Sequence, residues 1–156
     1  RAETAGIDGL ITVDLPPEED GPLRDALAAR GIAAIRLATP TTSEQRMARI
    51  ADGAGGFVYY VSVAGVTGAG TGSEDEIRVG VERARRLSRL PVAVGFGVRT
   101  PEQAATFARL ADGVVVGSAL VEEVRKATES GHIKSCVKGV SVVAKSLSNA
   151  IRSARA

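Results

Sequence analysis

Glycine-rich turns follow two neighbouring apolar runs in the second half of the chain. The first turn is Gly95-Phe96-Gly97, after Val92 to Val94, and the second is Gly117-Ser118-Ala119, after Val114 to Val116. Glycines let backbone N–H groups approach phosphate oxygens with no Cβ in the way, and a helix start at Ser118 adds aligned peptide dipoles and a hydroxyl donor. One such turn alone is typical of an ordinary strand end, but two in succession indicate a phosphate-binding site.

A third glycine-rich segment is Gly65-Val66-Thr67-Gly68-Ala69-Gly70-Thr71-Gly72, whose composition is that of a mobile lid. No Lys follows a glycine at the place that a Walker A loop requires, and Gly95-Phe96-Gly97 lacks the third glycine of a dinucleotide fingerprint. Nucleotide binding is therefore only weakly supported. The alternative for Gly65 to Gly72 is a flexible linker that touches no ligand.

Few other side chains have types that suit catalysis or ligand binding. Asp14 follows an apolar run, where its carboxylate could face a site or cap the loop that follows. Glu18, Glu19 and Asp20 are expected in the first turn of a helix, where their charges suit the helix dipole. His132 is the only histidine, and with no second ligand nearby it is expected at the surface.

The elements that must position these residues alternate along the chain. Five short runs rich in Val and Ile have the length and composition of buried strands: Leu10 to Val13, Ala33 to Leu37, Phe57 to Val61, Val92 to Val94 and Val114 to Val116. Amphipathic helical patterns lie between them. Capping boxes predict helix starts at Thr42 with Gln45, Ser73 with Glu76, and Thr100 with Gln103. This alternation predicts a parallel sheet covered by helices.

A weak internal repeat favours a closed barrel over a doubly wound sheet. Ala5 to Ile11 resembles Leu110 to Val115, as expected of a duplicated βα unit. A complete (β/α)8 TIM barrel takes roughly 250 residues, so residues 1–156 are expected to form a single partial barrel domain of five βα units. The amphipathic stretch Ile133 to Ala154 predicts a closing helix. Arg1 to Gly6 resembles the last turn of a helix and no initiator Met is present, so we expect further sequence upstream.

Aromatic residues could contribute a wall for a flat apolar ligand. Tyr59 and Tyr60 are adjacent in one predicted strand, so one should point into the barrel and the other towards the helices. Phe96 could line such a ligand, although core packing is the simpler account.

Composition excludes several classes of protein. The net charge is +2, with Lys and Arg scattered along the helices, so nucleic acid is not an expected partner. Cys136 is the single cysteine, so neither a disulfide framework nor a zinc cluster is expected, and no metal site is predicted. No apolar run approaches the ~18 residues of a membrane span. These features favour a reducing cytoplasm.

Several of these segments together resemble the alpha subunit family of tryptophan synthase. The resemblance covers nearly the whole chain, in order, spacing and chemistry, although each glycine motif alone recurs in other phosphate-binding barrels. It is carried by Asp8 to Pro16, Tyr59, Ser62 to Gly68, Gly95 to Gly97 with Pro101 to Gln103, and Gly117 to Ala119.

The resemblance implies strands 4 to 8 of a TIM barrel, in a lyase that cleaves indole-3-glycerol phosphate by a retro-aldol reaction into indole and glyceraldehyde 3-phosphate. It further implies tryptophan biosynthesis, a heterotetramer, and a beta subunit that receives the indole and uses pyridoxal phosphate; no cofactor is implied for this chain. The implied phosphate ligands are Gly68, Gly97, Gly117 and Ser118. The implied indole-pocket residues are Tyr59, Phe96 and Leu37, with Thr67 in the closing lid.

The family's catalytic pair, one Glu and one Asp, belongs to the second βα unit, which this sequence lacks. No catalytic residue is therefore assigned here, and the chain alone is expected to be inactive. Ser62-Val63-Ala64 also replaces a more polar run expected before the lid. Two alternatives stay open: a non-catalytic half-barrel that binds phosphorylated ligands and docks on a partner, and another phosphate-binding barrel enzyme, for instance an isomerase or a flavin enzyme.

Overall fold

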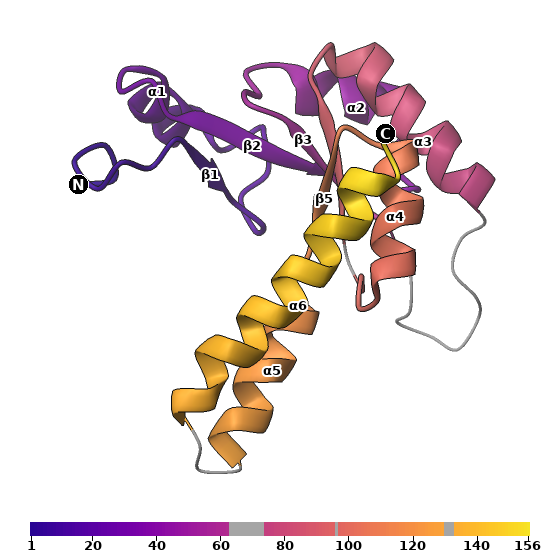
Figure 1. The fold of residues 1–156 in the computed structure, drawn as a ribbon. Helices are drawn as coiled ribbons and strands as arrows, with labels where there is room; N and C mark the ends of the chain where they lie inside the picture. The colour runs from indigo at the N-terminus through magenta and orange to yellow at the C-terminus, as the bar shows by residue number, and fades with distance from the viewer. Residues whose placement is uncertain (63–73, 96, 130–132) are drawn as a thin grey trace.

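The computed structural model describes residues 1–62, 74–95, 97–129 and 133–156. Five parallel strands lie side by side in chain order (Figure 1): β1 Gly9–Ile11, β2 Ala33–Ala38, β3 Val58–Val61, β4 Val92–Gly95 and β5 Gly113–Val115. The helices are α1 Gly21–Ala28, α2 Glu44–Ala51, α3 Glu74–Ser88, α4 Pro101–Leu110, α5 Ser118–Glu129 and α6 Ile133–Ser153. All five predicted strands are present, with ends shifted by one or two residues.

The register of the sheet gives each face one parity of residue number. Leu37 pairs with Tyr59, Tyr59 with Ala93, and Ala93 with Gly113, so odd-numbered residues share one face and even-numbered residues the other. The even face is the covered one, because its side chains are fully buried under α2, α3 and α4: Val58, Tyr60, Val92 and Val94. The odd face is more open, because Leu37 and Tyr59 on it are only half-buried, whereas their even-numbered neighbours Ala38 and Tyr60 are each 1% exposed.

Helix starts follow the predicted caps in one case and depart from them in another. Thr100 forms the expected capping box with Gln103 at the start of α4. The box predicted at Thr42 is wrong, because Ser43 is the N-cap of α2 and accepts from the Arg46 N–H. The Thr42 hydroxyl instead accepts from the Thr39 N–H, at 2.9 Å. The box predicted at Ser73 lies outside the described residues.

The predicted place of Glu18, Glu19 and Asp20 in a first helical turn is also wrong. The helix begins one residue later, at Gly21, and Asp20 is its N-cap residue with no side-chain cap. Asp20 is buried and pairs with the guanidinium of Arg36, while Glu18 pairs with Arg46 of α2. These carboxylates therefore tie the loop before α1 to neighbouring elements.

Asp112 joins the starts of β4 and β5. Its carboxylate accepts from the Val92 N–H at 2.8 Å and from Arg85 at 3.1 Å. Although partial burial opposes ionisation, these donors hold the pKa of Asp112 below its ordinary value. The ion pair helps to set the β4–β5 register, on which the position of the two glycine turns depends.

The two last helices form a hairpin that extends away from the sheet (Figure 1). α6 packs along both α5 and α4. Its C-terminal end is held beside α4, because Arg155, just after the helix, donates to the carbonyls of Ala108 and Ala111. The predicted closing helix is thus present. In the part of the chain that the structure describes, no helix is long and apolar enough to span a membrane.

Gly80 of α3 allows the ring of Tyr60 to lie directly against the helix backbone. A Cβ at this position would lie 2.0 Å from the Tyr60 hydroxyl oxygen and 2.6 Å from Cζ. Tyr60 is only 1% exposed, so its ring has no room to move. We expect Gly80→Ala to lower the free energy of unfolding by about 1–3 kcal/mol, because overpacking outweighs the better helix propensity of alanine. Urea denaturation followed by circular dichroism measures this loss.

Gly139→Ala in α6 is the matched control. Its Cβ would meet the side chain of Glu123, most closely a carboxylate oxygen at 3.1 Å, and this flexible group can move away. The control should therefore be neutral or stabilising. An equal loss from both substitutions would show that contact with Tyr60 is not the cause.

Candidate functional site

The two predicted glycine turns lie side by side at the carboxyl edge of the sheet. Gly95 of β4 pairs with Val115 of β5, and Gly97 and Gly117 each stand two residues beyond these partners. Because the strands are parallel, both turns leave the sheet at the same edge. The structure therefore brings together the two segments from which the sequence predicted phosphate binding.

The first turn is short and anchored at both ends. Gly97 has a φ of +78°, the left-handed region in which glycine alone is unstrained. Val98, directly after it, is 2% exposed and packs in the core, and α4 begins after the Thr100 cap. The backbone from Gly97 onward is thus held close to the edge of the sheet.

The second turn leads straight into α5. The Gly117 carbonyl accepts from the Leu120 and Val121 N–H groups, so the N–H groups of Ser118 and Ala119 are in the first turn, where a helix leaves its donors unpaired. No acidic side chain lies in this turn, and Ser118 is exposed. The start of α5 can therefore accept an anion.

Gly117 is a glycine that the surrounding described structure does not require. A Cβ there would meet no described atom within 4 Å, and its φ is not in the left-handed region. Gly117 is the N-cap residue of α5, since its carbonyl accepts from the Val121 N–H, and glycine is favoured over alanine at this position. Close approach of a ligand to the backbone is a second physical reason for glycine here.

Tyr59 and Leu37 form an apolar wall on the odd face. They are register partners on β3 and β2, and both are half-buried. The ring of Tyr59 lies against Gly95, where a Cβ would come within 2.8 Å of it. Burial raises the pKa of the Tyr59 hydroxyl, so it stays protonated and can donate. The prediction that Tyr59 and Tyr60 point to opposite faces is confirmed.

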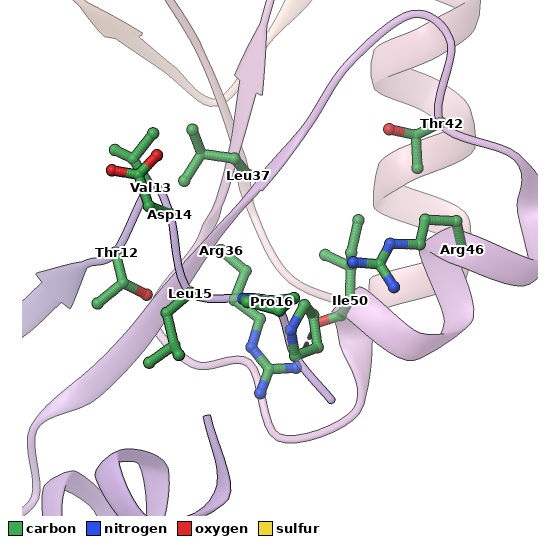
Figure 2. A pocket seen from close by; sticks show the side chains of 11 residues that line it. Thr12, Val13, Asp14, Leu15, Pro16, Arg36, Leu37, Thr42, Arg46 and Ile50 are labelled. Carbon is green, nitrogen blue, oxygen red and sulfur yellow. Dashed lines mark hydrogen bonds between the residues drawn. The ribbon is translucent and has the colours of Figure 1, made fainter. Parts of the chain in front are cut away.

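A pocket of about 280 Å³ lies beside this wall, between the loop after β1, strand β2 and helix α2 (Figure 2). Asp14 and Leu37 both line it, so the predicted carboxylate does face a cavity at the carboxyl edge. The guanidinium of Arg36 reaches the pocket from the helix-covered side, where it is held by Asp20. This pocket thus adjoins the wall of Tyr59 and Leu37.

Three of the predicted site residues, Thr67, Gly68 and Phe96, lie outside the described residues. The predicted surface residue His132 also lies outside them.

Sequence reasoning assigned no role to Ser62, which is buried and bonded to Gly95 at the end of β4. A small polar residue at the end of an apolar strand was the only signal for it. Within the described ranges, no group of three His, Cys, Asp or Glu residues could hold a metal ion.

Comparison with known proteins identifies the family. The family model for the tryptophan synthase alpha chain matches residues 1–152. The tryptophan synthase alpha chain of Caulobacter sp. (strain K31) is 54% identical over 154 residues, which are 99% of this chain and 55% of that protein. The chain belongs to the tryptophan synthase alpha chain family.

Solved structures from this family share the fold. Tryptophan synthase subunit alpha from Legionella pneumophila str. Paris matches with a TM-score of 0.84 at 38% identity, over 97% of this chain and 55% of that one. Tryptophan synthase from M. tuberculosis matches with a TM-score of 0.80 at 32% identity, over 97% and 53%. The partial TIM barrel predicted from the sequence is confirmed. The chain spans about half the length of the tryptophan synthase alpha chains it matches.

Proposed function

We propose that this chain carries the phosphate-binding and indole-binding part of a lyase that cleaves indole-3-glycerol phosphate into indole and glyceraldehyde 3-phosphate. The observation that carries the proposal is the pairing of the Gly97 and Gly117 turns at one edge of the sheet, with α5 starting directly after the second turn. Membership of the tryptophan synthase alpha chain family supports the choice of substrate.

In this proposal the phosphate sits between the two turns. The N–H groups of Ser118 and Ala119 and the Ser118 hydroxyl donate to its oxygens, and the dipole of α5 favours its charge. Gly97 and Gly117 contribute backbone with no Cβ between it and the ligand. The phosphate lies away from the bond that breaks, so its binding energy serves to hold the reacting end in place.

The indole ring lies against Tyr59 and Leu37. Both side chains are on the odd face, which is the open one, and a flat apolar ring buries area against them. Phe96, Thr67 and Gly68 are proposed to complete the indole wall, the lid and the phosphate site, respectively.

A retro-aldol cleavage also requires acid and base groups. One group takes the proton of the hydroxyl beside the breaking bond, and another gives a proton to the leaving carbon. We assign neither role to this chain, and place both on the βα units that the longer relatives carry. In the same proposal the indole passes to a beta subunit that holds pyridoxal phosphate, within a cytoplasmic heterotetramer.

Substitution of Gly117 tests the phosphate site directly. The protein for this test is a fusion of the N-terminal part of the Caulobacter relative, which this chain does not cover, to residues 1–156; we call it the fused protein. We expect Gly117→Ala to weaken binding of glycerol 3-phosphate by about tenfold or more, because the added Cβ keeps the phosphate oxygens from the backbone. Isothermal titration calorimetry measures both this affinity and that for indole.

Gly21→Ala, at the start of α1, is the matched control. It also adds a Cβ that meets no described atom within 4 Å, at another helix start without a left-handed φ. The control should leave both affinities unchanged. If Gly117→Ala also leaves glycerol 3-phosphate binding unchanged, the phosphate lies elsewhere and the proposal is wrong. Tighter binding of flavin mononucleotide than of glycerol 3-phosphate would favour a flavin-binding barrel instead.

A further inference from the structure

Ser62 lies where β3 ends, and it is the residue that joins this strand to the phosphate-binding edge. It is 1% exposed. Both its backbone N–H and its hydroxyl donate to one acceptor, the Gly95 carbonyl, each at 3.1 Å. The last carbonyl of β4 is therefore held by two donors from the neighbouring strand.

Gly95 is confined from its other sides as well. A Cβ on it would lie 2.8 Å from the Tyr59 ring and 2.8 Å from Val115. The peptide at Gly95 is thus packed between β3 and β5 as well as bonded to Ser62. Only one residue separates it from Gly97, and Val98, which follows Gly97, is buried in the core.

We propose that Ser62 is a positioning residue that fixes the Gly95 carbonyl and so sets the direction in which the Gly97 turn presents its backbone to phosphate. The inference rests on the proposed function and adds a residue to it that does not touch the ligand. The turn has two anchors, Val98 on one side and the Ser62–Gly95 contact on the other. Removing the hydroxyl loosens one anchor and leaves the backbone bond between the two strands in place.

Loss of the Ser62 hydroxyl is not expected to destabilise the fold. The hydroxyl is a donor, and its loss leaves the Gly95 carbonyl still bonded to the Ser62 N–H. Because no buried donor or acceptor is left without a partner, Ser62→Ala should change stability little. An effect on ligand binding would then come from the geometry of the turn.

The test compares two ligands in the fused protein. We expect Ser62→Ala to raise the Kd for glycerol 3-phosphate about tenfold, while the Kd for indole stays within about twofold because the wall of Tyr59 and Leu37 is unchanged. In steady-state assays the same variant should lower kcat/KM for indole-3-glycerol phosphate about tenfold, because a misplaced phosphate no longer holds the reacting end in position.

Ser141→Ala is the matched control, because the Ser141 hydroxyl also donates to a backbone carbonyl, that of Val137, at 2.7 Å but on the exposed surface of α6. It should change neither Kd. An unchanged Kd for glycerol 3-phosphate in Ser62→Ala overturns the inference, as does an equal loss for both ligands, which would indicate a general loosening of the fold. Failure of the fused protein with Ser62 intact to bind glycerol 3-phosphate overturns the proposed function instead.

Discussion

The fused protein should release indole from indole-3-glycerol phosphate, whereas residues 1–156 alone should not. In the proposed function, this chain provides the two glycine turns and the wall of Tyr59 and Leu37. The acid and base groups would come from the βα units that the longer relatives carry. Each general acid or base group contributes about 10²–10⁴-fold, so the rate difference should be at least of that order. Indole release, followed by absorbance or fluorescence, measures it.

The N-terminal part of the Caulobacter relative alone is the control for that experiment. It should also be inactive, because the proposed phosphate site belongs to residues 1–156. Appreciable turnover by residues 1–156 alone would contradict the division of roles. Attention would then turn to Asp14, the carboxylate that lines the pocket beside Leu37. An inactive fused protein that still binds glycerol 3-phosphate would support the alternative of a binding module without catalysis.

Strand positions and the paired glycine turns were predictable because both depend on local patterns. Buried strands read as runs of Val and Ile, and the turns follow directly from the ends of two such runs. The Thr100 cap was predictable for a similar reason, since Pro101 leaves little choice of starting residue. These features need no knowledge of what packs against them.

The errors arise where two neighbouring residues have the same chemistry. Thr42 and Ser43 both carry a hydroxyl, and only the fold decides that Thr42 closes the preceding turn while Ser43 caps α2. The acidic run Glu18 to Asp20 was placed inside the first turn of the helix, whereas it lies just before the helix. Pro22 was the available signal, because proline is favoured at the start of a helix and places that start at Gly21.

Contacts between distant segments had almost no signal in the sequence. Ser62 and Gly95 are 33 residues apart, and the close packing of Gly80 on Tyr60 joins β3 to a helix that follows it. Arg36 was the one visible anomaly, a charged residue inside the apolar run of β2. An unpaired charge is costly to bury, so Arg36 required a buried acidic partner. No local sequence pattern identified Asp20 as that partner.

Arg36 carries the largest stability effect that we expect of a single substitution. Its side chain is 6% exposed. The guanidinium pairs with the equally buried Asp20 and donates to the carbonyls of Arg49, Ile50 and Asp52 at the end of α2. Arg36→Leu should lower the free energy of unfolding of the fused protein by about 3–5 kcal/mol, because it leaves the buried Asp20 carboxylate with only the more distant Arg24, at 3.9 Å. Urea denaturation measures the change.

The double variant Asp20→Leu with Arg36→Leu separates the ion pair from the carbonyl contacts. Removing the stranded carboxylate should recover part of the loss, since replacing both members of a buried pair is far less harmful than replacing one. Recovery should stay incomplete, because the carbonyls at the end of α2 still lack their donor. The stability of Arg36→Lys should lie between those of the wild type and Arg36→Leu. An ammonium keeps the charge but cannot donate to the carboxylate and the carbonyls with a planar fork of N–H groups.

The exposed pair of Arg125 and Glu122 provides the control, and Arg125→Leu should have a much smaller effect. A loss from Arg36→Leu no larger than that from Arg125→Leu would mean that the buried pair contributes no more than a surface one.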